Sequence, residues 1–224
     1  MRSGSGSLLQ IRNYAVEARR IRTRLTTSET RWRKFVENTK GQPPWPRLVG
    51  AADMFDQPGD ALDVGAGAGR DTAYLLLRGW RVTAVDSSPS AAAALRRLPG
   101  RRKLHVVVSA IQDFEPATYD LVNAQFALPF IPRTQFDATV ERLRESVRPG
   151  GVIAATFFGK GDEWNVPGTG QNFSSRADVE RIFSGWEITD LTEVEEDGHT
   201  ADGTPKHWHV FHVIARRPAD SRDT

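Results

Sequence analysis

The chain has 224 residues, of which 39% are hydrophobic and 26% charged, and it contains no cysteine. A chain of this length buries enough apolar surface to fold as one domain without a disulfide or a structural metal. The absence of cysteine excludes a disulfide scaffold, a thiolate zinc site and a cysteine nucleophile. No stretch reaches the roughly 20 apolar residues of a bilayer span, so we expect a soluble protein in the cytoplasm.

The formal net charge of +2 is unevenly distributed along the chain. Residues 1–40 contain ten Arg or Lys residues and three acids, whereas the remaining 184 residues contain 20 bases and 25 acids. Such a basic segment is typical of an arm that binds nucleic acid, or of a face that attracts an acidic substrate. A solvated helix docked on an acidic body has the same composition, so both interpretations stay open at this point.

The N-terminal part predicts a tail, two helical pieces and a linker. Residues 1–7 are rich in Gly and Ser, as in a disordered tail. Apolar residues then recur at helical spacing over 8–36, with a polar break at 26–28. The three prolines within residues 41–46 cannot occupy a helix interior, so this segment is expected to link to a short helix at 46–55.

Further along the chain, strand-like apolar runs alternate with helical stretches. The expected strands are 61–64, 81–85, 104–108, 119–124 and 152–158, with helices at 71–78, 89–98 and 136–147 between most of them. A helix near 174–183 precedes strands near 186–193 and 206–216, which are joined without a helix and therefore pair antiparallel. The predicted fold class is α/β: a doubly wound, mostly parallel, seven-stranded Rossmann-like sheet with a reversed C-terminal edge strand and N-terminal lid helices.

The most informative stretch is residues 62–71, Leu-Asp-Val-Gly-Ala-Gly-Ala-Gly-Arg-Asp, where a strand runs into alternating glycines and then a helix. Such a loop lets a ligand approach the backbone and presents free N–H groups at a helix N-terminus. The spacing is G-x-G-x-G rather than the G-x-G-x-x-G of dinucleotide sites. The charge of Asp63, at the end of the strand, disfavours a pyrophosphate and suits a ligand with an amino group and a sulfonium cation.

A second carboxylate, Asp86, ends the next strand 23 residues after Asp63. A carboxylate at the tip of the second strand accepts hydrogen bonds from ribose hydroxyls. The alternative is that Asp86 caps the helix that begins near Ser88. The nearby glycine loop and Asp63 favour the interpretation that Asp86 binds a ligand.

These residues resemble a known family. Asp63-Val-Gly-Ala-Gly-Ala-Gly69, Val85-Asp86-Ser-Ser-Pro and Pro149-Gly150-Gly151 are similar to motifs of the class I S-adenosylmethionine (SAM)-dependent methyltransferases, over about residues 48–158 and the last strand. The phrases Thr39-Lys-Gly-Gln-Pro-Pro44 and Pro205-Lys-His-Trp-His-Val-Phe-His-Val213 resemble bacterial members near the tellurite-resistance and thiopurine methyltransferase branches, which modify small molecules. Together with the composition of the two ends, this gives the predicted domains: a disordered tail (1–7), an N-terminal helical lid (8–46), a SAM-binding methyltransferase domain (47–217) and a second disordered tail (218–224).

The resemblance also implies S-adenosyl-L-methionine as the cofactor. By this resemblance, the glycines of the loop would line the methionyl part of the cofactor, and Asp86 would hold its ribose. Many relatives carry an acid where Ala110 stands, so here the backbone of Ile111 and the side chain of Gln112 are expected to cover the adenine. The predicted cofactor-binding residues are Asp63, Gly65, Gly67, Gly69, Asp86, Ser87, Ala110, Ile111, Gln112 and Gln125.

The fourth strand is expected to end at the reacting methyl group, and there the chain reads Asn123-Ala-Gln-Phe126. This segment lacks both prolines of the Asn/Asp-Pro-Pro-aromatic tetrad found in methyltransferases that act on the amines of bases. Methylation of a base carbon through a cysteine adduct is impossible without cysteine. The residues therefore favour a small-molecule acceptor over RNA or DNA.

Three regions are candidates for the acceptor pocket. The aromatic stripe of Tyr14, Trp32, Phe35 and Trp45 is either ordinary packing or part of a lid, and the Gly-rich loop that follows Phe158 and contains Trp164 is expected to cover the site. Strand alternation puts His207 and His209 on one face, and Trp208 and His212 nearer the other. The predicted catalytic residues are His207, His209, Gln125 and Tyr14, and the predicted substrate-binding residues are Tyr14, Trp32, Phe126, Phe158, Trp164 and His207.

The histidines suit a general base, or they are edge-strand residues bonded to backbone or solvent. No third ligand accompanies them, so no metal site is predicted. The predicted function is methyl transfer from SAM to O, N or S of a small-molecule metabolite, by a monomer or homodimer with no membrane or nucleic-acid partner. The alternatives are an RNA or DNA methyltransferase that uses the basic segment, an NAD-binding oxidoreductase, and a SAM-binding protein without activity.

Overall fold

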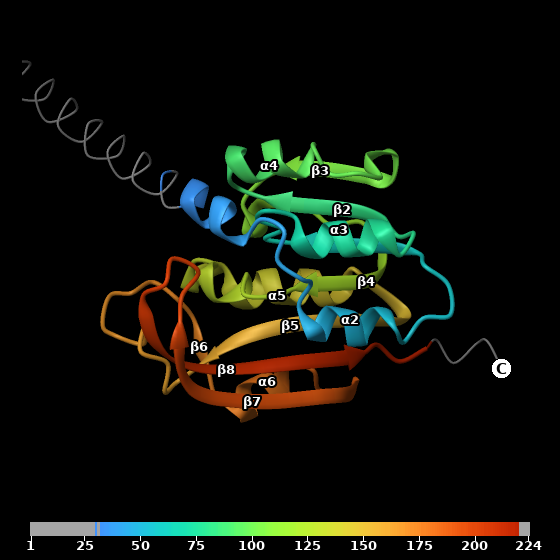
Figure 1. The fold of residues 1–224 in the computed structure, drawn as a ribbon. Helices are drawn as coiled ribbons and strands as arrows, with labels where there is room; N and C mark the ends of the chain where they lie inside the picture. Colours follow the sequence, from blue (N-terminus) through green and yellow to red (C-terminus); the bar gives the residue numbers. More distant parts are fainter. Residues whose placement is uncertain (1–29, 31, 220–224) are drawn as a thin grey trace, which may run out of the picture.

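The computed structural model describes residue 30 and residues 32–219 (Figure 1). The predicted tail at 1–7 and most of the predicted lid, including Tyr14, lie outside the described residues, as do residues 220–224 of the predicted C-terminal tail. Residues 32–39 are helical, and no helix among the described residues is long and apolar enough to cross a bilayer.

One mixed sheet forms the centre of the molecule, with the strand order β3-β2-β1-β4-β5-β8-β7 and the short β6 beside β5. Strands β1 to β6 pair in parallel, whereas β8 runs antiparallel to both β5 and β7. The strands are β1 (Asp60–Val64), β2 (Arg81–Asp86), β3 (Leu104–Val108), β4 (Tyr119–Ala124), β5 (Val147–Gly159), β6 (Phe173–Ser174), β7 (Glu187–His199) and β8 (Pro205–Arg216).

This arrangement confirms the predicted α/β class and the mostly parallel, Rossmann-like sheet. Two details differ from the prediction. The two-residue strand β6 brings the number of strands to eight. The reversed strand β8 lies between β5 and β7, so the sheet edge is formed by β7.

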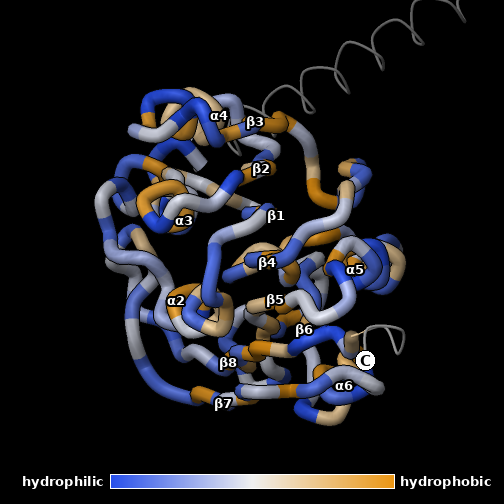
Figure 2. The backbone as a smooth tube through the Cα atoms, turned by 90° about the vertical axis from the view of Figure 1, so that its right-hand side faces the viewer, coloured by the Kyte–Doolittle hydropathy of each residue, from blue (hydrophilic) through white to orange (hydrophobic). Residues whose placement is uncertain are grey.

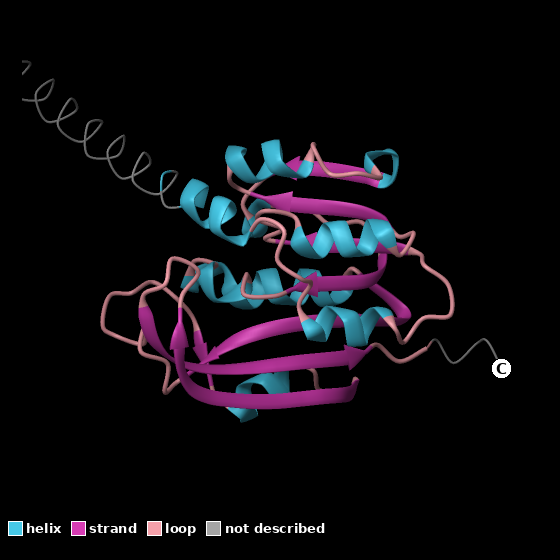
Figure 3. Ribbon diagram, in the orientation of Figure 1, coloured by secondary structure: helices cyan, strands magenta, loops and turns pink. Residues whose placement is uncertain are grey.

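Helices cover both faces of the sheet, as Figures 2 and 3 show. The chain moves outward from β1 through β2 to β3 and then returns to β4, so right-handed crossovers put the helices before and after this return on opposite faces. Helices α2, α3 and α4 lie on one face, and α5 and α6 on the other. The helices are α2 (Pro46–Ala52), α3 (Arg70–Leu77), α4 (Pro89–Leu95), α5 (Phe136–Glu145) and α6 (Arg176–Ile182).

An apolar cluster lies on each face of the sheet. On one face Leu48, Leu75 and Leu95 of the helices pack with Ile214 of β8. On the other face, α5 and α6 pack against strand residues whose side chains point to the opposite side of the sheet, such as Phe157 of β5 and Phe211 of β8. All these side chains are at most 6% exposed, so burial on both faces explains why the strands read as continuous apolar runs.

The start of β5 lies five residues before the start of the predicted strand 152–158. The strand begins at Val147, and Pro149-Gly150-Gly151 forms an irregular stretch within it, where the β4–β5 register shifts. Gly150 has a φ of 76°, and a Cβ on Gly151 would lie 2.7 Å from the carbonyl oxygen of Asp120. Gly150 therefore permits the positive φ, and Gly151 permits a close approach of β5 to β4.

The chain reverses its direction of travel across the sheet between β1 and β4. In open α/β sheets, ligands bind outside the carboxyl ends of the strands at such a switch point. The helical residues 32–39 lie at this end of the sheet (Figure 1). The functional residues are therefore sought here.

Candidate active site

The glycine loop connects β1 to α3 at the switch point. Gly65, Gly67 and Gly69 have φ values of 68°, 52° and 82°, a conformation that L side chains rarely adopt. A Cβ on Gly65 would lie 2.7 Å from the Cβ of Ala127, and one on Gly69 would lie 2.9 Å from the side chain of Leu95. The backbone conformation therefore favours glycine at all three positions, and the space beside Gly65 favours it as well.

Asp86 lies at the end of β2 with its carboxylate turned toward the glycine loop. The carboxylate accepts hydrogen bonds from the N–H groups of Gly67 and Ser88, each at 2.8 Å. Ser88 precedes α4, so Asp86 supports the start of this helix, and it also holds the glycine loop. The neighbouring Ser87 is exposed.

The side chain of Asp63 points into the protein and not, as predicted, toward a ligand. It is 2% exposed, and both carboxylate oxygens are occupied within the protein, by the Thr72 hydroxyl at 2.5 Å and by Asn123 Nδ2 at 2.9 Å. Asn123 Nδ2 also donates to Asp71 at 2.9 Å, and Asp71 accepts from the N–H of Trp45 at 3.0 Å. Asp63 therefore links the glycine loop to Thr72 of α3 and Asn123 of β4 and does not face a ligand.

Burial also changes the pKa values of the two carboxyl groups. Burial raises the pKa of Asp63 to about 7, and the nearby Asp71 adds to the increase. Burial likewise raises the pKa of Asp71. The prediction assumed a fixed negative charge at Asp63, but a carboxyl with this pKa is partly protonated at neutral pH. Sequence reasoning also missed Asp71 and Asn123, because nothing local indicates that residues so far apart in the chain converge.

The predicted adenine-binding segment follows β3. Val108 pairs with Asp86 in the sheet register, and Ile111 begins a 3₁₀ turn that ends at Asp113. Ile111 is half-buried against the apolar core, and the carbonyl of Gln112 accepts from Arg142 at 2.6 Å. The segment from Ala110 to Gln112 thus lies next to Asp86 at the same sheet end.

An aromatic cluster surrounds Phe126 at the end of β4. Its ring centroid is 4.5 Å from that of Trp45, 5.9 Å from Trp208, 5.8 Å from the imidazole of His212 and 6.3 Å from Phe158. Phe126 also has a φ of 53°, a left-handed conformation that costs energy for a bulky residue and often marks functional sites.

Two further predicted substrate residues lie at the edge of this cluster, Trp32 through Phe130 and Trp164 also by direct contact with Phe158 and Trp208. The ring centroids of Trp32 and Trp164 lie 5.9 Å and 6.4 Å from that of Phe130, which is 5.7 Å from Phe158. The structure thus brings together Trp32, Phe126, Phe158 and Trp164, and adds Trp208. Strand alternation was the signal that placed Trp208 on this face.

The N-terminal helical residues lie against the glycine loop. A Cβ on Gly67 would be 3.4 Å from the ring of Phe35, and Val36 is buried with Ala68 of the loop and Ala91 of α4. The linker that follows is held as well, because the Arg70 guanidinium lies 4.2 Å from the ring centroid of Trp45. Among the described residues, the segment from 32 to 45 therefore borders the candidate cofactor site.

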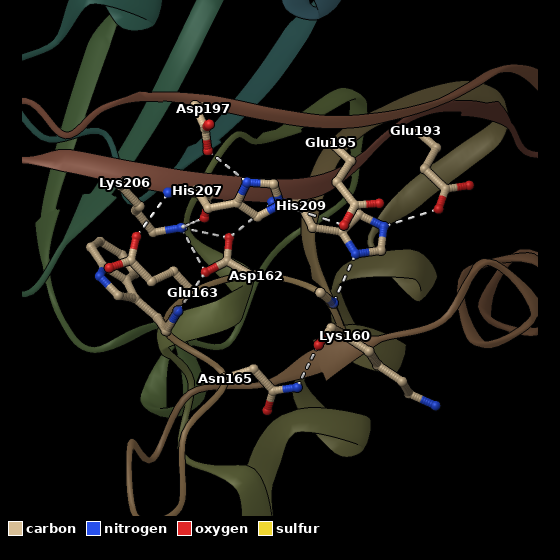
Figure 4. Close-up of polar contacts among 12 residues, drawn as sticks. Lys160, Asp162, Glu163, Asn165, Glu193, Glu195, Asp197, Lys206, His207 and His209 are labelled. Atoms are coloured by element: carbon tan, nitrogen blue, oxygen red, sulfur yellow. Dashed lines mark hydrogen bonds and ion pairs between the residues drawn. The ribbon is translucent and has the colours of Figure 1, made fainter.

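His207 and His209 point toward acidic side chains of β7 (Figure 4). His207 Nδ1 lies 2.8 Å from Asp197, a hydrogen bond that raises the pKa of His207. His209 Nε2 lies 2.9 Å from Glu193, and its Nδ1 accepts the N–H of Gly161 at 2.9 Å. The structure does not bring these predicted catalytic residues to the aromatic cluster.

Residues of β8 anchor the loop of residues 160–172, which we call the covering loop. The ammonium of Lys206 lies 2.6 Å from both carboxylate oxygens of Asp162 in the covering loop, and both side chains are at most 1% exposed (Figure 4). The ammonium is also 3.7 Å from the ring centroid of Trp208 and 4.5 Å from that of Trp164. This buried ion pair therefore joins the covering loop to β8 next to the rings of Trp164 and Trp208.

Comparisons with known proteins agree with this geometry. Residues 62–153 match a family model described as a methyltransferase domain. The crystal structure of TehB from Haemophilus influenzae aligns with a TM-score of 0.65 at 19% identity, over 76% of this chain and 61% of TehB. A 1,6-didemethyltoxoflavin-N1-methyltransferase from Burkholderia thailandensis aligns with a TM-score of 0.57 at 19% identity, over 97% of this chain and 92% of that one. Residues 62–153 thus match a methyltransferase domain, and the fold around them is similar to that of solved SAM-dependent methyltransferases.

Two curated proteins are similar to this chain over about two thirds of its length. A probable SAM-dependent methyltransferase TehB from H. influenzae is 23% identical over 159 residues, which are 69% of this chain and 55% of that protein. A protein named hemagglutinin 1 from Eikenella corrodens is 25% identical over 170 residues, or 72% of this chain and 55% of that protein. The chain thus spans about half the length of these curated relatives.

Proposed function

We propose that the protein transfers the methyl group of SAM to an oxygen, nitrogen or sulfur atom of a small molecule. The observation that carries this proposal is the arrangement at the switch point. The glycine loop and Asp86 lie on the β1–β2 side, and the strained Phe126 with its aromatic cluster lies at the end of β4, next to β1.

The residues of the loop fit the cofactor. SAM supplies a methyl group on a sulfonium centre, a ribose and an adenine. The Asp86 carboxylate, at the tip of β2, is placed to accept hydrogen bonds from ribose hydroxyls. The side-chain-free glycines permit close approach to the backbone, and Ile111 with Gln112 would border the adenine.

The aromatic cluster supports a planar acceptor molecule. Trp45, Phe126 and Trp208 are half-buried, so part of each ring is accessible for stacking. Displacement of a methyl group requires positioning of the acceptor in line with it, which flat, rigid ring contacts provide. One similar structure, the B. thailandensis enzyme, is named for methylation of a small molecule and holds that molecule and S-adenosylhomocysteine. The proposal includes a cytoplasmic monomer or homodimer that does not act on nucleic acid.

The cofactor assignment is tested by calorimetry with S-adenosylhomocysteine (SAH), the product form of the cofactor. Wild-type protein is expected to bind SAH, and Asp86→Ala to bind it about 10- to 100-fold more weakly because charge-assisted hydrogen bonds to the ribose are lost. Asp56→Ala, at an exposed aspartate, is the matched control and should bind like wild type. Equal affinity in Asp86→Ala and wild type would contradict the assignment, and NADH binding without SAH binding would indicate the oxidoreductase alternative.

A further inference from the structure

A row of buried polar side chains begins directly after β4, beside Phe126. The Thr156 hydroxyl donates to Gln125 Oε1 at 2.8 Å, and its oxygen lies 3.0 Å from His212 Nδ1. Thr156 and His212 are opposite each other in the β5–β8 register. Gln125 is 7% exposed, yet its Nε2 has no hydrogen-bond partner among the described residues.

The hydrogen bonds in this row run in one direction. Because the Thr156 hydroxyl gives its hydrogen to Gln125, its oxygen accepts a hydrogen from His212 Nδ1. Burial lowers the pKa of His212 to about 4, with a further contribution from the nearby Arg47. The imidazole is therefore neutral at physiological pH, with its one hydrogen on Nδ1. The amide oxygen of Gln125 is thereby fixed toward β5, and the amide N–H₂ points away from it.

An unpaired, buried N–H₂ group is unfavourable, and native proteins retain few of them. Gln125 stands at the switch point, where a ligand of this fold binds. A ligand atom that accepts a hydrogen bond would satisfy Nε2. The ring of Phe126, next to Gln125 in the chain, offers a flat apolar surface for the rest of such a ligand.

We propose that Gln125 selects the acceptor molecule by donating from its amide N–H₂ to a carbonyl oxygen or an unprotonated ring nitrogen of a planar substrate, while Thr156 and His212 position that amide. This inference rests on the proposed function. It makes Gln125 a residue that contacts substrate and His212 a positioning residue that acts through Thr156. It also replaces His207 and His209 with His212 as the histidine that matters for the acceptor site.

The test uses the full chain loaded with SAH and two probes of matched shape: 1-indanone, which has a carbonyl oxygen, and indane, which lacks one. Binding is followed by saturation-transfer NMR and by tryptophan fluorescence. Wild type is expected to prefer 1-indanone about tenfold, the effect of one hydrogen bond to an otherwise unpaired buried donor. Gln125→Met keeps the length of the side chain and removes the N–H₂, so the preference should disappear.

A pair of His212 variants tests positioning. His212→Phe removes the hydrogen on Nδ1, and the preference should fall severalfold. His212→Asn supplies an amide N–H₂ near the same place, and the preference should return. Thr156→Val provides a second, nearly isosteric interruption of the row and should also lower the preference. Equal losses in His212→Phe and His212→Asn would show that His212 is merely structural and would overturn its assigned role.

The two proposals fail in different ways. If wild type does not bind SAH in calorimetry, the proposed function fails. If it binds SAH but does not prefer 1-indanone, whether both probes bind equally or neither binds, the role of Gln125 is overturned. A tenfold loss of SAH affinity in Gln125→Met with the probe preference intact would assign Gln125 to the cofactor, and would overturn it as well.

Discussion

At the scale of single residues, the junction of β1, β4 and α3 depends on two carboxylates that share one amide. Asn123 Nδ2 donates to Asp63 and to Asp71, each at 2.9 Å, in a region that water does not reach. Two buried carboxylates at this separation do not ionise independently, so one retains its proton to higher pH. The loop that borders the cofactor site is therefore held by a titrating pair.

This pair makes a prediction about stability and pH. The pKa of Asp63 is about 7 in the folded protein against an ordinary value of 3.8, so the folded state binds the proton more tightly. The stabilisation is complete below the ordinary value and is lost as pH rises through about 7. Asp63→Asn does not titrate. The free energy of unfolding of wild type minus that of Asp63→Asn should therefore fall between about pH 4 and pH 7, as measured by urea denaturation.

Asp202→Asn serves as the control for this measurement. Hydrogen bonds from the side chains of Thr200 and Thr204 lower the pKa of Asp202 to about 2. Its contribution is present above the ordinary value and is lost only as pH falls below it. The difference between wild type and Asp202→Asn should stay constant over the same range. A constant difference for Asp63→Asn would show that Asp63 is ionised throughout.

At the scale of elements, the covering loop is fixed to β8 by the buried pair of Lys206 and Asp162. Removing one partner of such a pair leaves an unpaired buried charge, which typically costs about 3–5 kcal/mol. Lys206→Met should therefore destabilise the protein by that amount. The double variant Lys206→Met, Asp162→Leu should recover most of the loss. Denaturant unfolding of wild type, both single variants and the double variant measures the coupling, and additive effects would contradict it.

Features that depend on local sequence could be predicted, whereas features that depend on contacts between distant residues could not. The strands, the glycine loop and the position of Asp86 were predictable because they depend on periodicity and on spacing within short segments. The inward turn of Asp63 was not, because it depends on Asn123, 60 residues away. Likewise, alternation separated His212 from His207 and His209 correctly, but only the sheet register shows that His212 faces Thr156.

At the scale of the whole molecule, charge and architecture together bear on the kind of substrate. The basic residues 1–40 end in a helical segment over the glycine loop, so at least its described part is engaged with the cofactor side of the domain. The exposed edge strand β7 carries acidic residues, among them Glu195 and Asp197, that pair with His207. An acidic sheet edge repels a phosphate backbone, whereas a half-buried aromatic cluster suits a small planar molecule.

This contrast predicts the response of nucleic-acid binding to salt. A protein that neutralises several phosphates loses affinity steeply with salt, by about 0.9 logarithmic units per phosphate for each tenfold increase. Fluorescence anisotropy of the full chain with a short RNA and a short DNA duplex should instead show weak binding that is negligible at about 150 mM salt. A steep slope that flattens when Arg19, Arg20, Arg22 and Arg24 are replaced by Ser, together with transfer of labelled methyl from SAM to that RNA or DNA, would support a nucleic-acid methyltransferase. Weak binding with an unchanged slope in that variant would instead assign the basic segment to the small-molecule enzyme.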